Sequence, residues 1–257
     1  MARIFITGSA DGLGQMAATL LVQQGHTVIL HARNPARAQQ ALQATPGVNT
    51  ALSADLSSIQ QTIRLAEEVN RLGPIDAVIH NAAVGYREPT RIATVDGLPQ
   101  VFAVNSLAPY ILTCLIKRPT RLIYISSGLH RQTDGGLDDL EWKKTKWNGF
   151  KAYSDSKLHD VIIAFAVARK WKDVYANALE PGWVATKMGG SSAPDNLEDG
   201  PKTQAWLAVS NDPAALVTGE YFYHMRPTPF NPLAKDGKVQ ENFLQQCEKL
   251  SGIAFPS

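Results

Sequence analysis

The chain has 257 residues, of which 44% are hydrophobic and 19% charged, and its formal net charge is +2. This balance is typical of one globular domain with a sizeable core. The charge is too small to indicate binding to nucleic acid or an anionic membrane, so we expect a small-molecule partner. The chain begins with a strand pattern, and no apolar run approaches the ~18 residues of a membrane span. We therefore predict a cytoplasmic protein without a membrane span.

The first half of the chain alternates short apolar runs with segments of helical periodicity. Strands are expected at 3–7, 26–33, 48–54, 75–81 and 121–127. Helices are expected at 13–25, 35–44, 58–72 (capped by Ser57) and around 98–116. Several strand runs are almost continuously apolar, as in parallel strands that are covered on both faces. The pattern predicts a doubly wound α/β fold of the Rossmann type, with about seven parallel strands flanked by helices on both faces.

The second half continues the same alternation, with a helix over about 152–172 and strands near 174–179 and 219–225. The segment 187–204 is rich in Gly, Ser, Pro and Asp, which predicts a mobile loop rather than a domain boundary. We therefore expect a single domain over 1–257. The two cysteines, Cys114 and Cys247, are isolated in helical stretches, so they predict neither a disulfide framework nor a metal site.

A glycine-rich turn, TGSADGLG, directly follows the first predicted strand and leads into a helix that starts at Leu13. Its three glycines, Gly8, Gly12 and Gly14, allow the backbone to turn tightly and to approach a pyrophosphate. The start of the helix offers unpaired N–H groups and the positive end of the helix dipole. Strand, turn and helix in this order predict a dinucleotide site.

The spacing T-G-x-x-x-G-x-G resembles that of the short-chain dehydrogenase/reductase superfamily. Further motifs appear in the order that the family shows: ADLSS (54–58), HNAAVG (80–85), Asn105, ISS (125–127), YSDSK (153–157) and EPGWVATKM (180–188). The segment 128–150 looks like an insertion beside the active site. That insertion and the ending FLQQCEKLSGI are similar to the retinol-dehydrogenase-like branch. The resemblance implies a nicotinamide-dependent oxidoreductase that acts on a carbonyl or alcohol group.

The end of the second strand bears on the choice of cofactor. An acidic residue there would bind ribose hydroxyls and repel a 2′-phosphate, but this chain has Ala32 followed by Arg33. A guanidinium suits a phosphate, so we expect NADP(H) to be favoured over NAD(H). Asp11, just before the middle glycine, argues against this preference.

The resemblance also implies contacts along the rest of the cofactor. The Asp55 side chain and the Leu56 backbone would meet adenine, Asn81 would begin the turn that lines the riboses, and Thr186 would bind the carboxamide. Ala83 stands where the family usually has glycine, which reduces the freedom of that turn. The full expected set is Gly8, Ser9, Asp11, Gly12, Leu13, Gly14, Arg33, Asp55, Leu56, Asn81, Ala82, Tyr153, Lys157, Pro181, Gly182, Val184 and Thr186.

Tyr153 and Lys157 are four residues apart on a predicted helix, so their side chains project from one face. A nearby ammonium favours the phenolate, so we expect a lowered tyrosine pKa and a role in proton exchange at the substrate oxygen. By resemblance, Ser127 hydrogen-bonds the substrate oxygen, whereas the Ser126 hydroxyl is structural. The expected catalytic set consists of Asn105, Ser127, Tyr153 and Lys157.

Asn105 lies in a predicted helix four residues before Pro109. Because proline has no N–H, the Asn105 carbonyl loses its helical partner, and a kink should follow. In the family this carbonyl holds a water that leads to the lysine. A kinked packing helix without that role is the alternative.

The insertion contains Trp142, Trp147 and Phe150, which could equally line an apolar substrate pocket or pack onto the domain. The resemblance implies a hydrophobic aldehyde, ketone or alcohol as substrate. His130 and His159 are interpreted as polar surface or pocket-rim residues. Two other functions stay open: a non-catalytic NAD(P)-binding sensor or scaffold, and an enzyme like the sugar-nucleotide epimerases. A homodimer or a homotetramer is also an open expectation, since both occur in the family.

Overall fold

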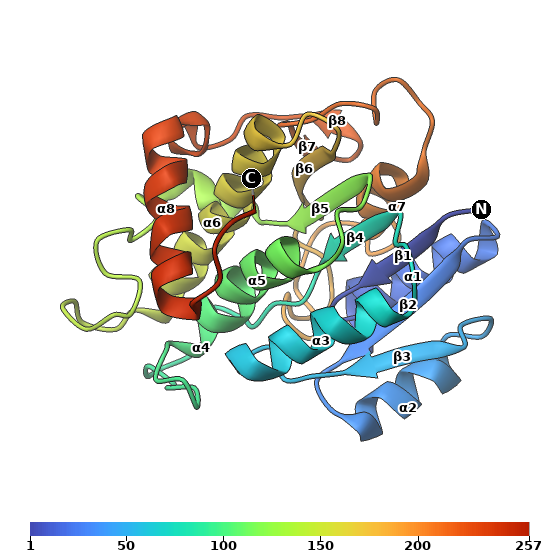
Figure 1. Ribbon diagram of the computed structural model, residues 1–257, viewed down its shortest axis with the longest axis horizontal. Coiled ribbons are helices and arrows are strands. Elements are labelled where there is room, and N and C mark those ends of the chain that lie inside the picture. Colours follow the sequence, from blue (N-terminus) through green and yellow to red (C-terminus); the bar gives the residue numbers. More distant parts are fainter. Residues whose placement is uncertain (257) are drawn as a thin grey trace.

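The computed structural model describes residues 1–256, and an eight-stranded sheet forms its centre (Figure 1). The strand order is β3-β2-β1-β4-β5-β6-β7-β8, and only the last pair is antiparallel. The strands are β1 (Arg3–Ile6), β2 (Thr27–Ala32), β3 (Thr50–Ser53), β4 (Ala77–His80), β5 (Arg121–Ile125), β6 (Tyr175–Glu180), β7 (Tyr221–Tyr223) and β8 (Arg226–Pro227). Seven parallel strands confirm the predicted sheet, and β8 adds a short edge strand that was not expected.

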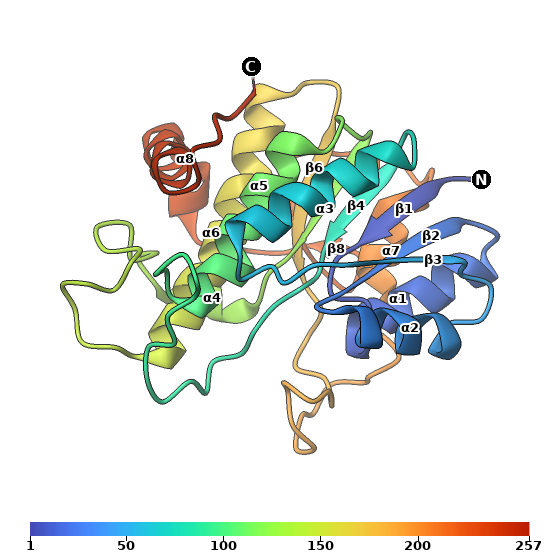
Figure 2. The ribbon, with the colours of Figure 1, turned by 60° about the horizontal axis from the view of Figure 1, so that its bottom comes forward.

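Helices cover both faces of the sheet (Figure 2). One face carries α1 (Gly12–Gln23), α2 (Pro35–Ala44) and α7 (Lys202–Val209). The other carries α3 (Ile59–Arg71), α5 (Ala108–Leu115) and α6 (Gly149–Lys170), and α8 (Gly237–Ser251) packs against α5 and α6. Each face has its own apolar core, and β4 and β5 are buried along their whole length because both layers cover them.

Local capping chemistry sets where the helices begin. Asn34 accepts a hydrogen bond from the Arg37 N–H, and Pro35 occupies the first position of α2. For α3 the predicted cap was wrong by one residue. The Ser57 N–H donates to the Asp55 carboxylate within a turn. The cap is Ser58, whose hydroxyl accepts a hydrogen bond from the Gln61 N–H in the first turn of the helix.

Several predicted segments differ from the structure in their boundaries; α6, for example, begins at Gly149 rather than at about 152. The helix expected around 98–116 is divided into α4 (Gln100–Phe102), a π-helical turn (Ala103–Leu107) and α5. The predicted loop 187–204 ends earlier, because α7 begins at Lys202. Within residues 1–256, no helix combines the length and apolar character that are needed to cross a bilayer.

The strand order reverses direction between β1 and β4, which lie side by side at the centre of the sheet. In doubly wound sheets, ligands bind beyond the carboxyl ends of the strands at such a point. The glycine-rich turn follows β1, Asn81 follows β4, and Ser127 follows β5. The topology therefore gathers segments that are far apart in the sequence at one edge of the sheet.

Candidate active site

The glycine-rich turn packs tightly against the segment after β4. Gly8 has φ +63°, and a Cβ there would lie 2.7 Å from the Cα of Ala82. A Cβ on Gly14 would lie 2.5 Å from Nδ2 of Asn81, the amide that donates to the carbonyls of Thr7 and Gly8. Gly12, in contrast, would meet nothing within 4 Å. The turn is thus closed on its protein side and open on the other, as a backbone cradle for a phosphate requires.

A cleft of about 690 Å³ extends from this turn along the ends of the strands. Its size and open backbone cradle fit a dinucleotide. Most of the expected cofactor residues line it: Gly8, Asp11, Gly12, Leu13, Arg33, Asp55, Leu56, Asn81, Ala82, Tyr153, Lys157, Pro181 and Thr186.

Four expected cofactor residues lie behind the wall of the cleft. The buried Ser9 hydroxyl donates to the Ile6 carbonyl and accepts from the His31 N–H. Gly14 packs on Asn81 as described, Gly182 adopts φ +85° against Asp195, and Val184 is buried. These residues shape the cleft without lining it.

One end of the cleft is basic, and two of its cations were not recognised in the sequence. Nη2 of Arg37 lies 2.6 Å from Oδ2 of Asp11, and Nζ of Lys187 lies 2.7 Å from the same oxygen. The hydrogen bond from Lys187 holds the pKa of Asp11 below its usual value, and Arg37 acts in the same direction. Two cations thus share a single carboxylate, and Arg33 lines the same cleft. The position of Arg37, four residues after Arg33 in the first turn of α2, is the sequence signal that could have indicated it.

Tyr153 and Lys157 lie at the inner end of the cleft, and both side chains are buried. Nζ of Lys157 is 5.7 Å from the centre of the tyrosine ring and donates to the Ile125 carbonyl at 2.8 Å. It also forms an ion pair of 2.9 Å with Asp160, a residue that sequence reasoning missed. Although burial acts to lower the pKa of Lys157, Asp160 raises it above the ordinary lysine value.

The pKa of Tyr153 is raised, which differs from the lowering expected from the sequence. Burial is the main cause, and the Lys157 ammonium and the hydrogen bond with Ser127 act in the opposite direction. The spacing correctly indicated the lysine's effect. It could not indicate that the phenol is almost excluded from water, which disfavours the phenolate.

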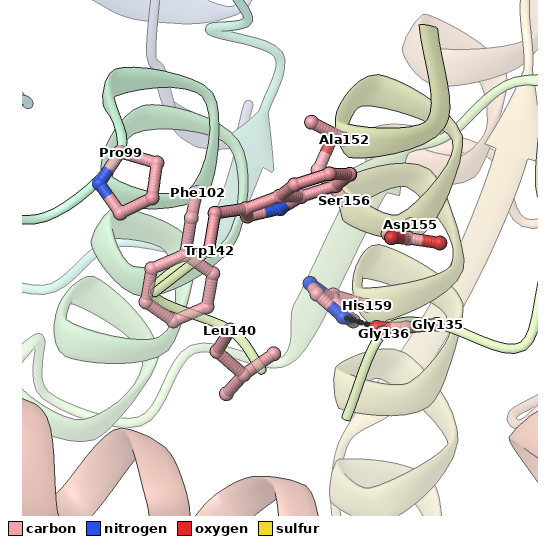
Figure 3. A pocket seen from close by; sticks show the side chains of 10 residues that line it. All are labelled: Pro99, Phe102, Gly135, Gly136, Leu140, Trp142, Ala152, Asp155, Ser156 and His159. Carbon is pink, nitrogen blue, oxygen red and sulfur yellow. Dashed lines mark hydrogen bonds between the residues drawn. The ribbon is translucent and has the colours of Figure 1, made fainter. Parts of the chain in front are cut away.

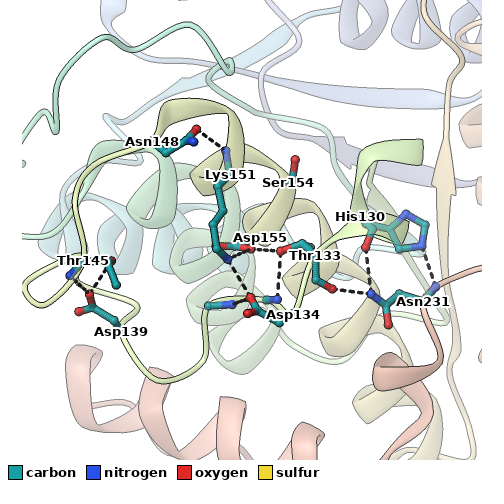
Figure 4. Close-up of polar contacts among 12 residues, drawn as sticks. His130, Thr133, Asp134, Asp139, Thr145, Asn148, Lys151, Ser154, Asp155 and Asn231 are labelled. Carbon is teal, nitrogen blue, oxygen red and sulfur yellow. Dashed lines mark hydrogen bonds and ion pairs between the residues drawn. The ribbon is translucent and has the colours of Figure 1, made fainter.

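Ser127 follows β5, and the interaction of its side chain with the phenol acts to lower the pKa of Tyr153. The neighbouring Ser126 hydroxyl donates to the Lys157 carbonyl at 2.6 Å and so fastens α6 to β5. His130 is fully buried, not on a rim as predicted, and it contacts Asn231 (Figure 4). Its Nε2 accepts from the Asn231 N–H, so its Nδ1 carries the proton and donates to the Ser127 carbonyl at 2.6 Å.

His159 is also buried rather than at a rim. Its Nδ1 bonds with the Ser106 hydroxyl, its Nε2 bonds with the Gly135 carbonyl, and its ring stacks on Phe243. Burial lowers the pKa values of His130 and His159 to about 4, so both are neutral near pH 7. Both histidines therefore have a structural role: their buried rings connect separate segments through hydrogen bonds.

The helix interruption at Asn105 lies where Pro109 predicted it. The Ala108 N–H bonds to the Ala103 carbonyl, which makes the π-helical turn. The Asn105 amide exchanges two hydrogen bonds with the Val84 backbone and donates to the Ser156 hydroxyl. Asn105 therefore anchors the turn after β4 through its side chain, while the role of its carbonyl in holding a water stays a prediction.

Aromatic rings from the insertion and from the segment after β4 join the apolar cluster that contains Tyr153. Trp142 and Trp147 pack edge to face at 5.1 Å, and Tyr86 packs against Tyr153 at 5.6 Å. Phe150 packs on Tyr86 but remains half exposed. These rings border an apolar cluster, completed by Val84, Val101, Leu129, Ala152 and Met188.

Polar contacts hold the insertion on α6 (Figure 4). Lys151 pairs with Asp134 at 2.8 Å and with Asp155 at 3.0 Å, and the Thr133 hydroxyl donates to Asp155. Trp142 of the insertion lies between α6 and Phe102, where it lines a small cavity (Figure 3). At about 10 Å³ this cavity has room for about one water, so it is not a substrate pocket.

Comparison with known proteins decides the family. Residues 2–131, about half of the chain, match the family model described as short chain dehydrogenase. The chain belongs to the short-chain dehydrogenase/reductase family. It is therefore an oxidoreductase whose family binds NAD(P), which favours this function over the sensor and the epimerase-like enzyme.

Individual relatives agree with this assignment. The chain is 45% identical over its whole length to an uncharacterized oxidoreductase of Emericella nidulans, 99% of which is covered. It is 29% identical to human retinol dehydrogenase 13, with 99% of this chain and 86% of the relative covered, which supports the predicted branch. An uncharacterized protein of Mycobacterium Paratuberculosis shares the fold, with a TM-score of 0.87, 24% identity, and coverage of 100% and 96%.

Proposed function

We propose that this short-chain dehydrogenase/reductase uses NADP(H) and transfers hydride between nicotinamide and an apolar aldehyde, ketone or alcohol. The observation that carries the proposal is the position of Tyr153. Its ring lies where the cleft meets the apolar cluster of Val84, Tyr86, Val101, Leu129, Trp142, Trp147, Ala152 and Met188. A substrate held by that cluster would bring its oxygen to the phenol.

The roles of the catalytic residues follow from their contacts. Tyr153 gives a proton to, or takes it from, the substrate oxygen, and Ser127 hydrogen-bonds that oxygen as charge develops on it. Lys157 steadies the charge on the phenolate, and Asn105 holds the adjoining turn. The nicotinamide, when bound, supplies or accepts the hydride. Asn81, Ala82 and Thr186 would hold its end of the cofactor.

The preference for NADP(H) is supported by the basic end of the cleft. Strand β2 ends at Ala32, so no carboxylate stands there to bind ribose hydroxyls. The cleft is lined by Arg33, Arg37 and Lys187, and the last two pair with Asp11. An additional phosphate dianion would find guanidinium donors there.

The apolar substrate class is supported by the apolar cluster that contains Tyr153. The Tyr86 ring packs edge to face on the Tyr153 ring, and Trp142 and Trp147 belong to the same cluster. Lys187 and Met188, at the start of the predicted mobile loop 187–204, also line the cleft. We infer that this loop covers both cofactor and substrate within the single domain.

A spectrophotometric screen tests the proposal. Purified protein would be assayed with hydrophobic aldehydes, ketones and alcohols, each with both cofactors, and small polar sugars would serve as the matched controls. We expect turnover with apolar compounds and a higher kcat/KM for NADPH than for NADH. Preference for NADH, or turnover confined to polar substrates, would contradict it.

A further inference from the structure

Asp160 is a buried carboxylate that the family motif does not explain. It follows Lys157 by three residues on α6, which places both side chains on one face of the helix. The two side chains are 2% and 3% exposed, and their charged atoms lie 2.9 Å apart. Burying two charges is costly unless they are paired, so the carboxylate is tied to the lysine that adjoins the reacting centre.

The surroundings of the ion pair restrict which groups can carry charge. Tyr124 on β5 and Tyr153 on α6 interact electrostatically with Asp160. Burial raises the pKa of Tyr124, and it lowers the pKa of His80, which stacks on Tyr124, to about 3. Both are therefore neutral near pH 7. Burial also raises the pKa of Asp160, to about 7, although Lys157 opposes this.

The two charges of the ion pair have opposite effects on the pKa of Tyr153. The Lys157 ammonium favours the phenolate, whereas the Asp160 carboxylate disfavours it. Coulomb interactions weaken only slowly with distance in a dry interior, so the carboxylate offsets part of the lysine's effect on the phenol. A lone lysine in this position would lower the pKa of Tyr153 more than the pair does.

We propose that Asp160 is a positioning residue: it holds Lys157 and offsets its charge at Tyr153, so that the site keeps a protonated phenol and is set for carbonyl reduction. The proposal rests on the proposed role of Tyr153 as the proton donor. In reduction, the carbonyl carbon takes the hydride from reduced nicotinamide, and its oxygen takes the phenolic proton. The carbonyl compound is reduced, the nicotinamide is oxidised, and solvent returns a proton to Tyr153.

The test titrates Tyr153 directly in the protein without cofactor. Tyrosine isotopically labelled at the hydroxyl-bearing carbon gives an NMR signal that reports each phenol, and Tyr153→Phe identifies the one that matters. In the wild type, Tyr153 should stay protonated up to at least its ordinary pKa of about 10. Titration of Tyr153 near neutral pH in the wild type would overturn the proposal, whatever the variants do.

The comparison of two variants isolates the carboxylate. Asp160→Asn keeps the shape and can still accept from Lys157, so the Tyr153 titration should move about one pH unit lower. The alkaline limit of carbonyl reduction should fall with it, and the ratio of oxidation to reduction at pH 7 should rise. Asp155→Asn, which removes another buried carboxylate of α6, should leave the Tyr153 titration in place.

A folded Asp160→Asn protein with an unchanged or higher Tyr153 titration would overturn the proposal. Its failure can be told from failure of the proposed function, because the titration needs no substrate. A Tyr153→Phe enzyme that turns over normally would contradict the proposed function and leave the titration result standing.

Discussion

Arg37 belongs to an ion pair in the unliganded cleft, where its guanidinium and Lys187 share the Asp11 carboxylate. The side chains of Arg37 and Asp11 are partly exposed, so the pair itself contributes little to stability. Its importance lies in its place on the cleft wall beside Arg33. A cofactor phosphate there would compete with Asp11 for the same guanidinium.

At the residue scale, we predict that Arg37→Ala raises the KM for NADPH about tenfold and changes the KM for NADH little. A charged hydrogen bond contributes about 1.5–3 kcal/mol, and tenfold corresponds to ~1.4 kcal/mol. Asp11→Asn should change the preference in the opposite direction because it frees Arg37. Steady-state kinetics with both cofactors measures this, with Arg71→Ala on α3 as the control. Equal losses with both cofactors would refute it.

The turn between β1 and α1 is the element on which the cleft depends. The Gly14 position is enclosed by Asn81 and the Gly8 carbonyl, so it has no room for a side chain. The cradle is therefore fixed by packing between two segments that follow neighbouring strands.

Gly14→Ala should lower the stability by about 1–3 kcal/mol, since the added methyl forces the turn and Asn81 apart. It should also weaken NADPH binding. Urea unfolding and fluorescence titration with NADPH measure the two effects. Gly237→Ala at the start of α8 is the matched control, because its added methyl meets nothing within 4 Å. Wild-type stability and binding in Gly14→Ala would show that the packing is not essential.

Local sequence patterns predicted most of the helices and strands. The apolar runs located the strands, and Pro109 located the helix interruption. The Tyr153–Lys157 spacing also gave the correct face of α6. Long-range packing could not be predicted in the same way. The burial of His130 depends on Asn231, which lies about a hundred residues later, and no local periodicity indicates that contact.

The same limit applied to the charges of the site. Lys187 meets Asp11 across 176 positions of sequence, and only the folded chain brings them together. The helical spacing of Asp160 and Lys157 could have predicted that they lie on one face of the helix. Their pairing could not be separated from ordinary surface pairing without knowing that the face is buried.

For the whole molecule, four buried histidines make stability depend on pH. Burial lowers the pKa values of His31, His130 and His159 to about 4 and that of His80 to about 3. Their unfolded pKa is about 6.5. Because the folded pKa is depressed, each contribution is present above about pH 6.5 and is lost as the pH falls towards the folded pKa.

We therefore predict that the free energy of unfolding decreases as the pH falls from 6.5 to 4. The decrease should be ~1.4 kcal/mol per pH unit for each histidine that takes up a proton when the chain unfolds. Asp160 opposes this, because its raised pKa makes unfolding release a proton in this range. Urea unfolding at a series of pH values measures the net slope. Constant or rising stability on acidification would contradict the prediction.

The most direct test of the account is the Tyr153→Phe variant in the carbonyl-reduction assay. Removing only the hydroxyl should leave NADPH binding and the fold intact and should abolish turnover, since no other group is placed to supply the proton in the proposed mechanism. Binding is followed by NADPH fluorescence and the fold by thermal unfolding. An undiminished rate in a folded, NADPH-binding variant would contradict the account.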